Sequence, residues 1–106
     1  MQAELEQDQN LNEIVSKLKN HFKPEKTYLF GSRANGTATT DSDYDLFLII
    51  KNSNVSQIKR MQEARKILSD RTVSVDVFIY TEDEFADWKD EFSSIAHTVA
   101  TEGIEL

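Results

Sequence analysis

Two motifs stand in one segment: Phe30-Gly31-Ser32-Arg33-Ala34-Asn35-Gly36, then residues 37–42, then Asp43-Tyr44-Asp45-Leu46-Phe47-Leu48-Ile49-Ile50. A short apolar run ends at the Gly-Ser pair, and two carboxylates open a second apolar run. Ten residues, 33–42, separate the Gly-Ser pair from the first carboxylate. This spacing makes the combination more specific than either motif alone, because short motifs by themselves are weak signals.

The carboxylates of Asp43 and Asp45 precede five apolar residues, Leu46 to Ile50, that predict a strand buried on both faces. Side chains alternate along a strand, so the two carboxylates project from one face, about 6 to 7 Å apart. They repel each other unless a cation lies between them, and oxygen ligands of this kind suit Mg²⁺. The alternative is that both are turn residues of a polar loop, the role that we assign to Asp41.

The Gly-Ser pair predicts a sharp turn into a short helix whose first amide groups are free to bind an anion. Gly31 lets the backbone approach closely, Ser32 offers a hydroxyl, and Arg33 supplies a charged fork suited to phosphate. Taken alone, Ser32 could equally be a plain helix N-cap beside a solvated arginine. Together with the carboxylates, the turn describes a triphosphate cradle that faces a metal site.

In this combination the sequence resembles the nucleotidyltransferase superfamily that includes DNA polymerase beta, whose signature adds a third carboxylate on a later strand. Asp76 interrupts the alternating residues 73–79, although a carboxylate there opposes both strand propensity and burial. The resemblance implies that Asp76 shares a metal with Asp43 and Asp45. The alternative is a surface aspartate on an edge strand.

Length and composition limit the remaining possibilities. With 106 residues the chain predicts one domain, in which residues 1–9 form a loosely ordered arm. No apolar run is long enough for a membrane span, and the absence of cysteine excludes disulfides and thiolate metal sites, which fits a cytoplasmic protein. A net charge of −7 argues against binding long nucleic acid, whereas bound Mg²⁺ and Arg33 would offset that charge for a nucleoside triphosphate.

Hydrophobic periodicity predicts an α/β fold in the order helix, strand, short helix, strand, helix, strand, helix. The expected architecture is a small mixed β-sheet with flanking helices, which the resemblance identifies as a nucleotidyltransferase core. The helices are expected over residues 10–22, 55–68 and from residue 82, where Thr81 opens a capping box. The other expected strands cover residues 27–30 and 72–80.

Several residues along these helices also have an expected place. Asn10 is expected to cap the first helix, and the basic residues of the second, Lys59, Arg60, Arg65 and Lys66, to form a solvated face. Trp88 and Phe92 are most simply core residues, with exposure to a partner as the alternative. A helix break near residues 93–94 stays open. His21 and His97 are expected at the surface.

Within the superfamily, residues 28–106 resemble the minimal nucleotidyltransferases, the MNT family. The chain departs from that family at Asn35, where members often have arginine, which implies a weaker or different grip on the triphosphate. The resemblance implies transfer of AMP from ATP with loss of pyrophosphate, assisted by two Mg²⁺ ions, or by Mn²⁺. Asp43 and Asp45 would bridge both ions, and Asp76 would complete the site of the ion that activates the acceptor hydroxyl. Gly31, Ser32 and Arg33 would hold the phosphates.

The MNT resemblance also implies a partner, a HEPN-domain ribonuclease toxin, with which the chain would form a hetero-oligomer. The chain would then be an antitoxin that attaches AMP to a tyrosine of the toxin. Two alternatives stay open: an antitoxin that neutralises by binding alone, and an enzyme that modifies a small molecule such as an antibiotic. The intact carboxylates weigh against the first alternative, and the lack of a second domain against the second.

Overall fold

The computed structural model describes residues 8–39, 42–70 and 73–106. Residues 1–7 of the arm expected at residues 1–9, and the turn residue Asp41, lie outside this part of the chain. The last two residues of that expected arm, Asp8 and Gln9, instead form the start of a helix. Four strands form one mixed sheet in the order β3-β2-β1-β4. They are β1 (Lys26–Phe30), β2 (Tyr44–Ile50), β3 (Val75–Thr81) and β4 (Ile104–Glu105). The predicted α/β fold with a mixed sheet is confirmed.

The pairing of the strands places β2 and β1 in the middle of the sheet. β2 is parallel to β3 and antiparallel to β1, while β4 pairs antiparallel with the other edge of β1. β4 is absent from the prediction, because its two residues are too short to show a periodic pattern.

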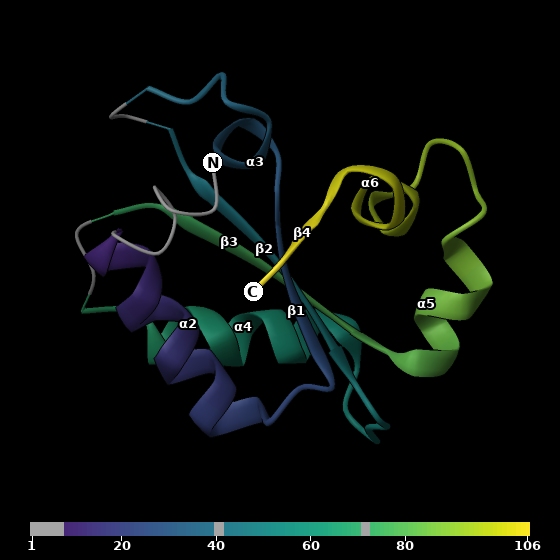
Figure 1. Cartoon of the computed structure of the whole chain (residues 1–106). Helices are drawn as coiled ribbons and strands as arrows, with labels where there is room; N and C mark the ends of the chain where they lie inside the picture. The colour runs from purple at the N-terminus through teal and green to yellow at the C-terminus, as the bar shows by residue number, and fades with distance from the viewer. Residues whose placement is uncertain (1–7, 40–41, 71–72) are drawn as a thin grey trace.

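Helices cover both faces of the sheet. They are α2 (Gln9–Phe22), α3 (Ser32–Asn35), α4 (Gln57–Ile67), α5 (Glu82–Trp88) and α6 (Ile95–Glu102). Figure 1 shows α2 and α4 together on one side of the sheet and α5 and α6 on the other. In the described part of the chain, no helix has the length and apolar character needed to cross a membrane.

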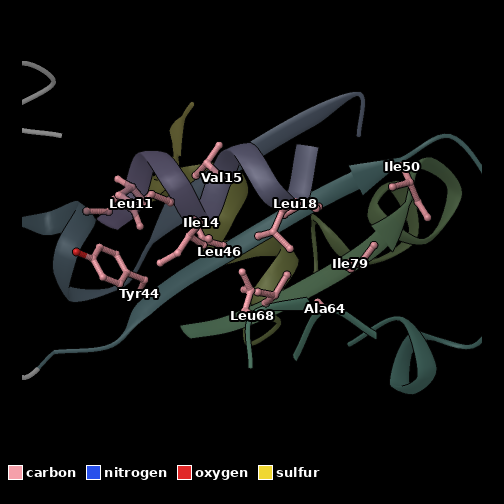
Figure 2. Close-up of a cluster of buried hydrophobic side chains, with 14 residues drawn as sticks. Leu11, Ile14, Val15, Leu18, Tyr44, Leu46, Ile50, Ala64, Leu68 and Ile79 are labelled. Carbon is pink, nitrogen blue, oxygen red and sulfur yellow. The ribbon is translucent and has the colours of Figure 1, made fainter. Parts of the chain in front are cut away.

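Alternating side chains of β2 supply both layers of the core. Leu46, Leu48 and Ile50 pack toward α2 and α4, in the cluster shown in Figure 2. Phe47 and Ile49 pack on the opposite face, in a cluster that includes residues of α6. The prediction of a strand buried on both faces is confirmed, and this burial holds β2 in the centre of the molecule.

The bounds of the predicted helices change at α2 and at α4, which covers Gln57–Ile67 rather than residues 55–68, and the open question of a break in the final segment is answered. α2 begins at Gln9, and Asp8 rather than Asn10 is its N-cap and accepts a hydrogen bond from the Leu11 amide. The final segment does break: α5 ends at Trp88, and Ser94 caps α6.

The expectation that Trp88 and Phe92 belong to the core is wrong. Trp88 is 51% exposed and Phe92 is 87% exposed. Both lie at or after the end of α5, beyond the part of the helix that Phe85 packs against the sheet. The alternative, in which the two rings face outward, is the one that the fold adopts.

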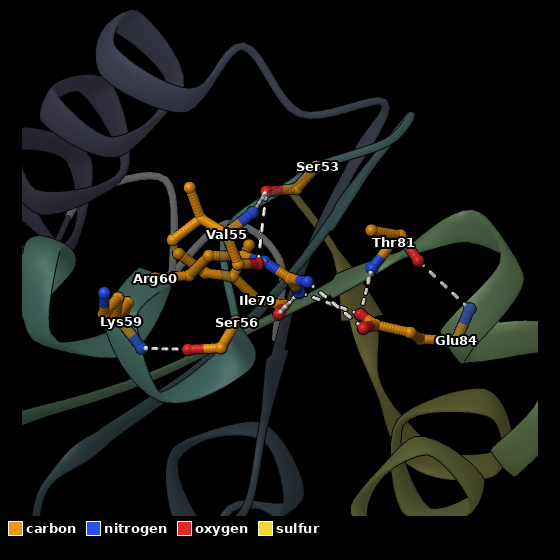
Figure 3. Close-up of polar contacts among 8 residues, drawn as sticks. All are labelled: Ser53, Val55, Ser56, Lys59, Arg60, Ile79, Thr81 and Glu84. Atoms are coloured by element: carbon orange, nitrogen blue, oxygen red, sulfur yellow. Dashed lines mark hydrogen bonds and ion pairs between the residues drawn. The ribbon is translucent and has the colours of Figure 1, made fainter.

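The solvated basic face expected for α4 is also wrong at Arg60, which is only 5% exposed. Figure 3 shows its polar contacts. Its guanidinium donates to the carbonyls of Val55 and Ile79 and to both carboxylate oxygens of Glu84, at 2.8 and 3.1 Å. Glu84 also closes the capping box with Thr81, as predicted. Arg60 therefore ties α4 to the end of β3 and the start of α5.

Candidate active site

Register across three strand ends brings the predicted site residues together. β1 pairs Phe30 with Asp45, and β2 pairs Asp45 with Asp76. Neighbouring strands lie about 4.8 Å apart, so Asp45 and Asp76 are adjacent. By alternation, both lie on the face that carries Phe47 and Phe78 and that α5 and α6 cover farther along the sheet.

The three carboxylates form an electrostatically strained group. Burial raises the pKa of Asp45 above its usual value, and the charges of Asp76 and Asp43 raise it further. Asp43 and Asp76 are exposed, whereas Asp45 is partly buried. Two like charges close to a third favour either a proton or a bound cation between them. The site therefore has the donor chemistry of a hard-cation site.

Gly31 brings the turn after β1 into direct contact with Asp45. Its backbone angles, φ 76° and ψ −156°, belong to a region that is almost restricted to glycine. A Cβ atom at this position would collide with the carboxylate of Asp45. Gly31, not Ser32, is the N-cap of α3, which differs from the plain-cap alternative.

The start of α3 leaves backbone donors near the carboxylates. The first hydrogen bonds of this short helix run from the amides of Ala34 and Asn35 to the carbonyl of Gly31. The amides of Ser32 and Arg33 precede them and have no acceptor within the helix. This is the arrangement of a turn that can receive an anion.

The side chain of Arg33 contacts the side of β2 opposite to Asp45. Its Nε and Nη2 atoms both donate to the carbonyl of Ser42, at 3.0 and 2.8 Å. The guanidinium also stacks on the ring of Tyr44, 4.0 Å from the ring centre. Tyr44 faces away from Asp45 on β2, so Arg33 holds the spacer against the opposite side of the strand. Its expected role as a phosphate ligand stays a prediction.

Tyr44 connects this arrangement to the start of α2. Burial raises the pKa of Tyr44 to about 12, and its hydrogen bond to Asp8 acts in the same direction. The hydroxyl therefore stays protonated and donates to the Asp8 carboxylate at 2.7 Å. Neither residue was among the sequence candidates, since their 36-residue separation hides the contact.

Asn35, which stands where the MNT family often has arginine, is used within the spacer. Its side-chain oxygen accepts hydrogen bonds from the amide and the hydroxyl of Thr37, at 3.1 and 2.6 Å. The residue is exposed. Asn35 thus stabilises the turn after α3. Unlike an arginine at this position, it provides no positive charge for the carboxylates.

A hollow of about 430 Å³ opens beside the carboxylates at the β3 edge of the sheet. It is lined by Asp43, Asp76, Arg65, Leu68, Ser69, Val73, Ser74 and Val75. The sequence prediction placed Arg65 on a solvated face and did not connect it with Asp76. Only the packing of α4 against β3 brings the two into one hollow.

The three aspartates supply the oxygen ligands that suit a metal ion and lie on neighbouring strand ends, but their carboxylates do not converge on one point. In the part of the chain that the structure describes, no three side chains of histidine, cysteine, aspartate or glutamate lie close enough to hold an ion as they stand. Rotation of exposed Asp43 and Asp76 about their side-chain bonds would be needed to gather them around one.

Comparison with known proteins identifies relatives of this chain. Residues 12–106 match the family model described as polymerase beta, nucleotidyltransferase. The superfamily expected from the Gly-Ser turn and the carboxylates is thereby confirmed. Among curated proteins, none matches this sequence.

Several solved structures are similar, among them the following three. A protein from Sulfolobus solfataricus assigned as a nucleotidyltransferase is 30% identical, with a TM-score of 0.56 over 74% of this chain and 69% of that one. A tyrosine-to-alanine mutant of the toxin–antitoxin MntA-HpeT is 26% identical, with a TM-score of 0.59 over 90% and 69%. A toxin–antitoxin structure with AMP-PNP is 22% identical and shares the fold, with a TM-score of 0.51 over 89% and 69%.

Proposed function

The chain belongs to the polymerase beta nucleotidyltransferase family, and from this membership we propose that it transfers AMP from ATP to a tyrosine of a partner HEPN-domain toxin. In this role it is an antitoxin that acts as a protein adenylyltransferase. The observation that carries the proposal is the position of Asp45, which lies between Asp76 on the next strand and the Gly31 turn.

Asp43, Asp45 and Asp76 are the proposed metal ligands and catalytic residues. Divalent cations, Mg²⁺ or Mn²⁺, would neutralise the phosphates and activate the attacking hydroxyl. Burial raises the pKa of Asp45, and the charges of Asp76 and Asp43, which raise it further, would attract a cation. Gly31 and Ser32 would receive phosphate oxygens through their backbone and hydroxyl groups.

The remaining chain residues would orient the two substrates. Gly31 keeps the phosphate-binding turn on the β1 side of Asp45, whereas the hollow with Asp76 opens on the β3 side. ATP would therefore lie toward α3 and the acceptor hydroxyl toward Asp76. Arg33, bonded to Ser42, would keep the spacer that leads to Asp43 in place, in addition to its expected contact with phosphate.

The partner in this proposal comes from the similar structures. One of them is a complex of MntA with HpeT in which a tyrosine is replaced, and another contains AMP-PNP with a toxin–antitoxin pair. The net charge of −7 suits a basic ribonuclease as partner, since opposite charges speed the encounter.

The test combines the purified chain with the HEPN-domain protein proposed as its partner, ATP and Mg²⁺. We expect the toxin to gain one or more AMP units on tyrosine, measured by intact-protein and peptide mass spectrometry. Asp45→Asn should lower the transfer rate by orders of magnitude, as loss of a comparable stabilising group does. Its thermal stability without Mg²⁺ should be retained or raised, because the repulsion with Asp43 and Asp76 is relieved.

The same experiment separates the alternative of neutralisation by binding alone. If wild type and Asp45→Asn silence the toxin equally and no mass change appears, the transfer proposal fails. A dominant UMP or GMP adduct, when the four nucleotides compete, would overturn the choice of ATP and retain the transfer chemistry.

A further inference from the structure

The segment from the start of α5 to the following turn, residues 82–92, has a surface that the proposed chemistry does not use. We name it the acidic aromatic segment. It contains two large exposed rings, Trp88 at 51% and Phe92 at 87% exposure. Aromatic side chains this exposed are uncommon on a small domain and are typical of contact sites for other proteins.

The turn that presents these rings is held in place by hydrogen bonds. The Ser94 hydroxyl and the Glu91 amide both donate to the carbonyl of Trp88, at 2.7 and 3.0 Å. His97 Nδ1 bonds the carbonyl of Lys89 at 2.9 Å, and its ring lies 5.5 Å from that of Phe92. The rings are therefore displayed by an ordered turn, which reduces the entropy lost when a partner binds.

The charge on the segment is predominantly negative. Five exposed carboxylates accompany one lysine there: Glu82, Asp83, Asp87, Asp90 and Glu91, with Lys89. Glu84 is not counted among them, because it forms an ion pair with Arg60. The net −4 of these six residues is more than half of the net −7 of the chain. None of the five forms an ion pair with another described residue.

We propose that the acidic aromatic segment is the docking surface for a basic protein partner whose surface has an apolar recess for Trp88 and Phe92. This partner is the HEPN-domain protein whose tyrosine would accept AMP, so this inference rests on the proposed function. Nucleic acid and a second copy of this chain are both repelled by the carboxylates, whereas lysine and arginine on a partner would pair with them.

The position of the segment suits delivery of an acceptor to the carboxylates. β3 connects the two places: Asp76 lies near its first residue, and α5 starts directly after its last, Thr81. Five residues of strand span about 17 Å. A standard interface covers about 800 Å² of each protein, roughly 30 Å across. A partner seated on the segment would therefore have to extend along β3 to present a side chain at Asp76.

Trp88 is the only tryptophan of the chain and provides a direct probe. The chain is labelled with 5-fluorotryptophan and titrated with the unlabelled HEPN-domain protein proposed as its partner, while ¹⁹F NMR follows Trp88. We expect its resonance to shift as the complex forms. Raising salt from about 0.05 to 0.5 M should slow association at least about tenfold, as electrostatic steering predicts.

Matched variants separate the segment from other exposed side chains. Phe92→Ser should weaken association about tenfold or more, as the loss of an aromatic anchor does. Ile58→Ser is the control, because Ile58 is 69% exposed on α4, which covers the opposite face of the sheet. Asp87→Asn and Glu91→Gln should each slow association, while Glu102→Gln, at the far end of α6, should not.

The outcomes for docking and for transfer are independent. A complex that leaves the Trp88 resonance unchanged and tolerates Phe92→Ser overturns the docking surface, even if AMP transfer occurs. A shifted resonance without any AMP transfer supports the docking surface and overturns the proposed function. If no complex forms at all, this inference fails.

Discussion

Gly31 lies where β1 turns into α3 and where the backbone comes closest to the carboxylate of Asp45. Two separate constraints act on this residue: a positive φ of 76° and the lack of space for a side chain. Gly36, at the other end of α3, also has a positive φ, 84°, but has open space where a Cβ would be. The two glycines therefore allow backbone strain to be separated from contact with the site.

We predict that Gly31→Ala lowers both the stability and the AMP transfer rate, because it adds strain of about 1 to 3 kcal/mol and displaces Asp45. Gly36→Ala should lose about 1 to 2 kcal/mol of stability from its left-handed backbone and keep most of its activity. Thermal unfolding followed by circular dichroism, together with the transfer assay, measures both effects. Equal losses of activity in the two variants would contradict the close approach of Gly31 to Asp45.

At the scale of elements, the pair of Arg60 and Glu84 joins α4, β3 and α5. The Arg60 guanidinium bonds Glu84 and holds the pKa of that carboxyl down at about 2, well below its ordinary 4.5, and the Thr81 amide helps. Because the folded state lowers this pKa, the pair stabilises the fold fully above about pH 4.5. That stabilisation is lost as the pH falls toward 2.

We predict that Glu84→Gln lowers the free energy of unfolding at pH 7 by about 2 to 3 kcal/mol, since it leaves a buried arginine poorly paired. The difference from wild type should shrink between pH 4.5 and 2, where wild-type Glu84 becomes protonated. Urea unfolding at several pH values measures it, with exposed Asp83→Asn as the control. A difference that stays constant down to pH 2 would show that the carboxylate charge is not what stabilises.

At the scale of the whole molecule, negative charge is unevenly distributed. The acidic aromatic segment lies on the α5 side, and the carboxylates of the candidate site lie at the other end of β3. Like charges gathered in this way repel one another and lower the stability of the compact state. The Arg60–Glu84 pair is mostly buried, so salt screens it much less than these exposed charges.

We predict that the isolated chain becomes more stable as salt rises from about 0.01 to 1 M, where the Debye length falls from about 30 to 3 Å. A rise in Tm of roughly 3 °C is expected, equivalent to about half a kcal/mol. The double variant Asp87→Asn with Asp90→Asn should start from a higher Tm and gain less. Differential scanning calorimetry without Mg²⁺ provides the measurement, and a falling Tm would show that attractive pairs dominate.

The sequence alone determined those parts of the protein that depend on local pattern. The apolar run of β2, the turn after β1 and the capping box at Thr81 each lie within a few neighbouring residues. Periodicity and turn chemistry act over the same short range, so the α/β order could be predicted, and the three aspartates were identified through the family resemblance. The metal-binding and phosphate-binding roles of these residues remain predictions.

Tertiary structure decided which side of each helix is covered and which distant groups meet. Arg60 is buried because the carbonyl of Ile79 and the carboxylate of Glu84 lie within its reach, and neither is a neighbour in sequence. Phe92 is 87% exposed because it lies in the turn after α5, outside both core clusters, although its hydrophobicity favours a core equally well. β4 exists only because β1 has an open edge to pair with. Such contacts depend on long-range packing, which no local pattern records.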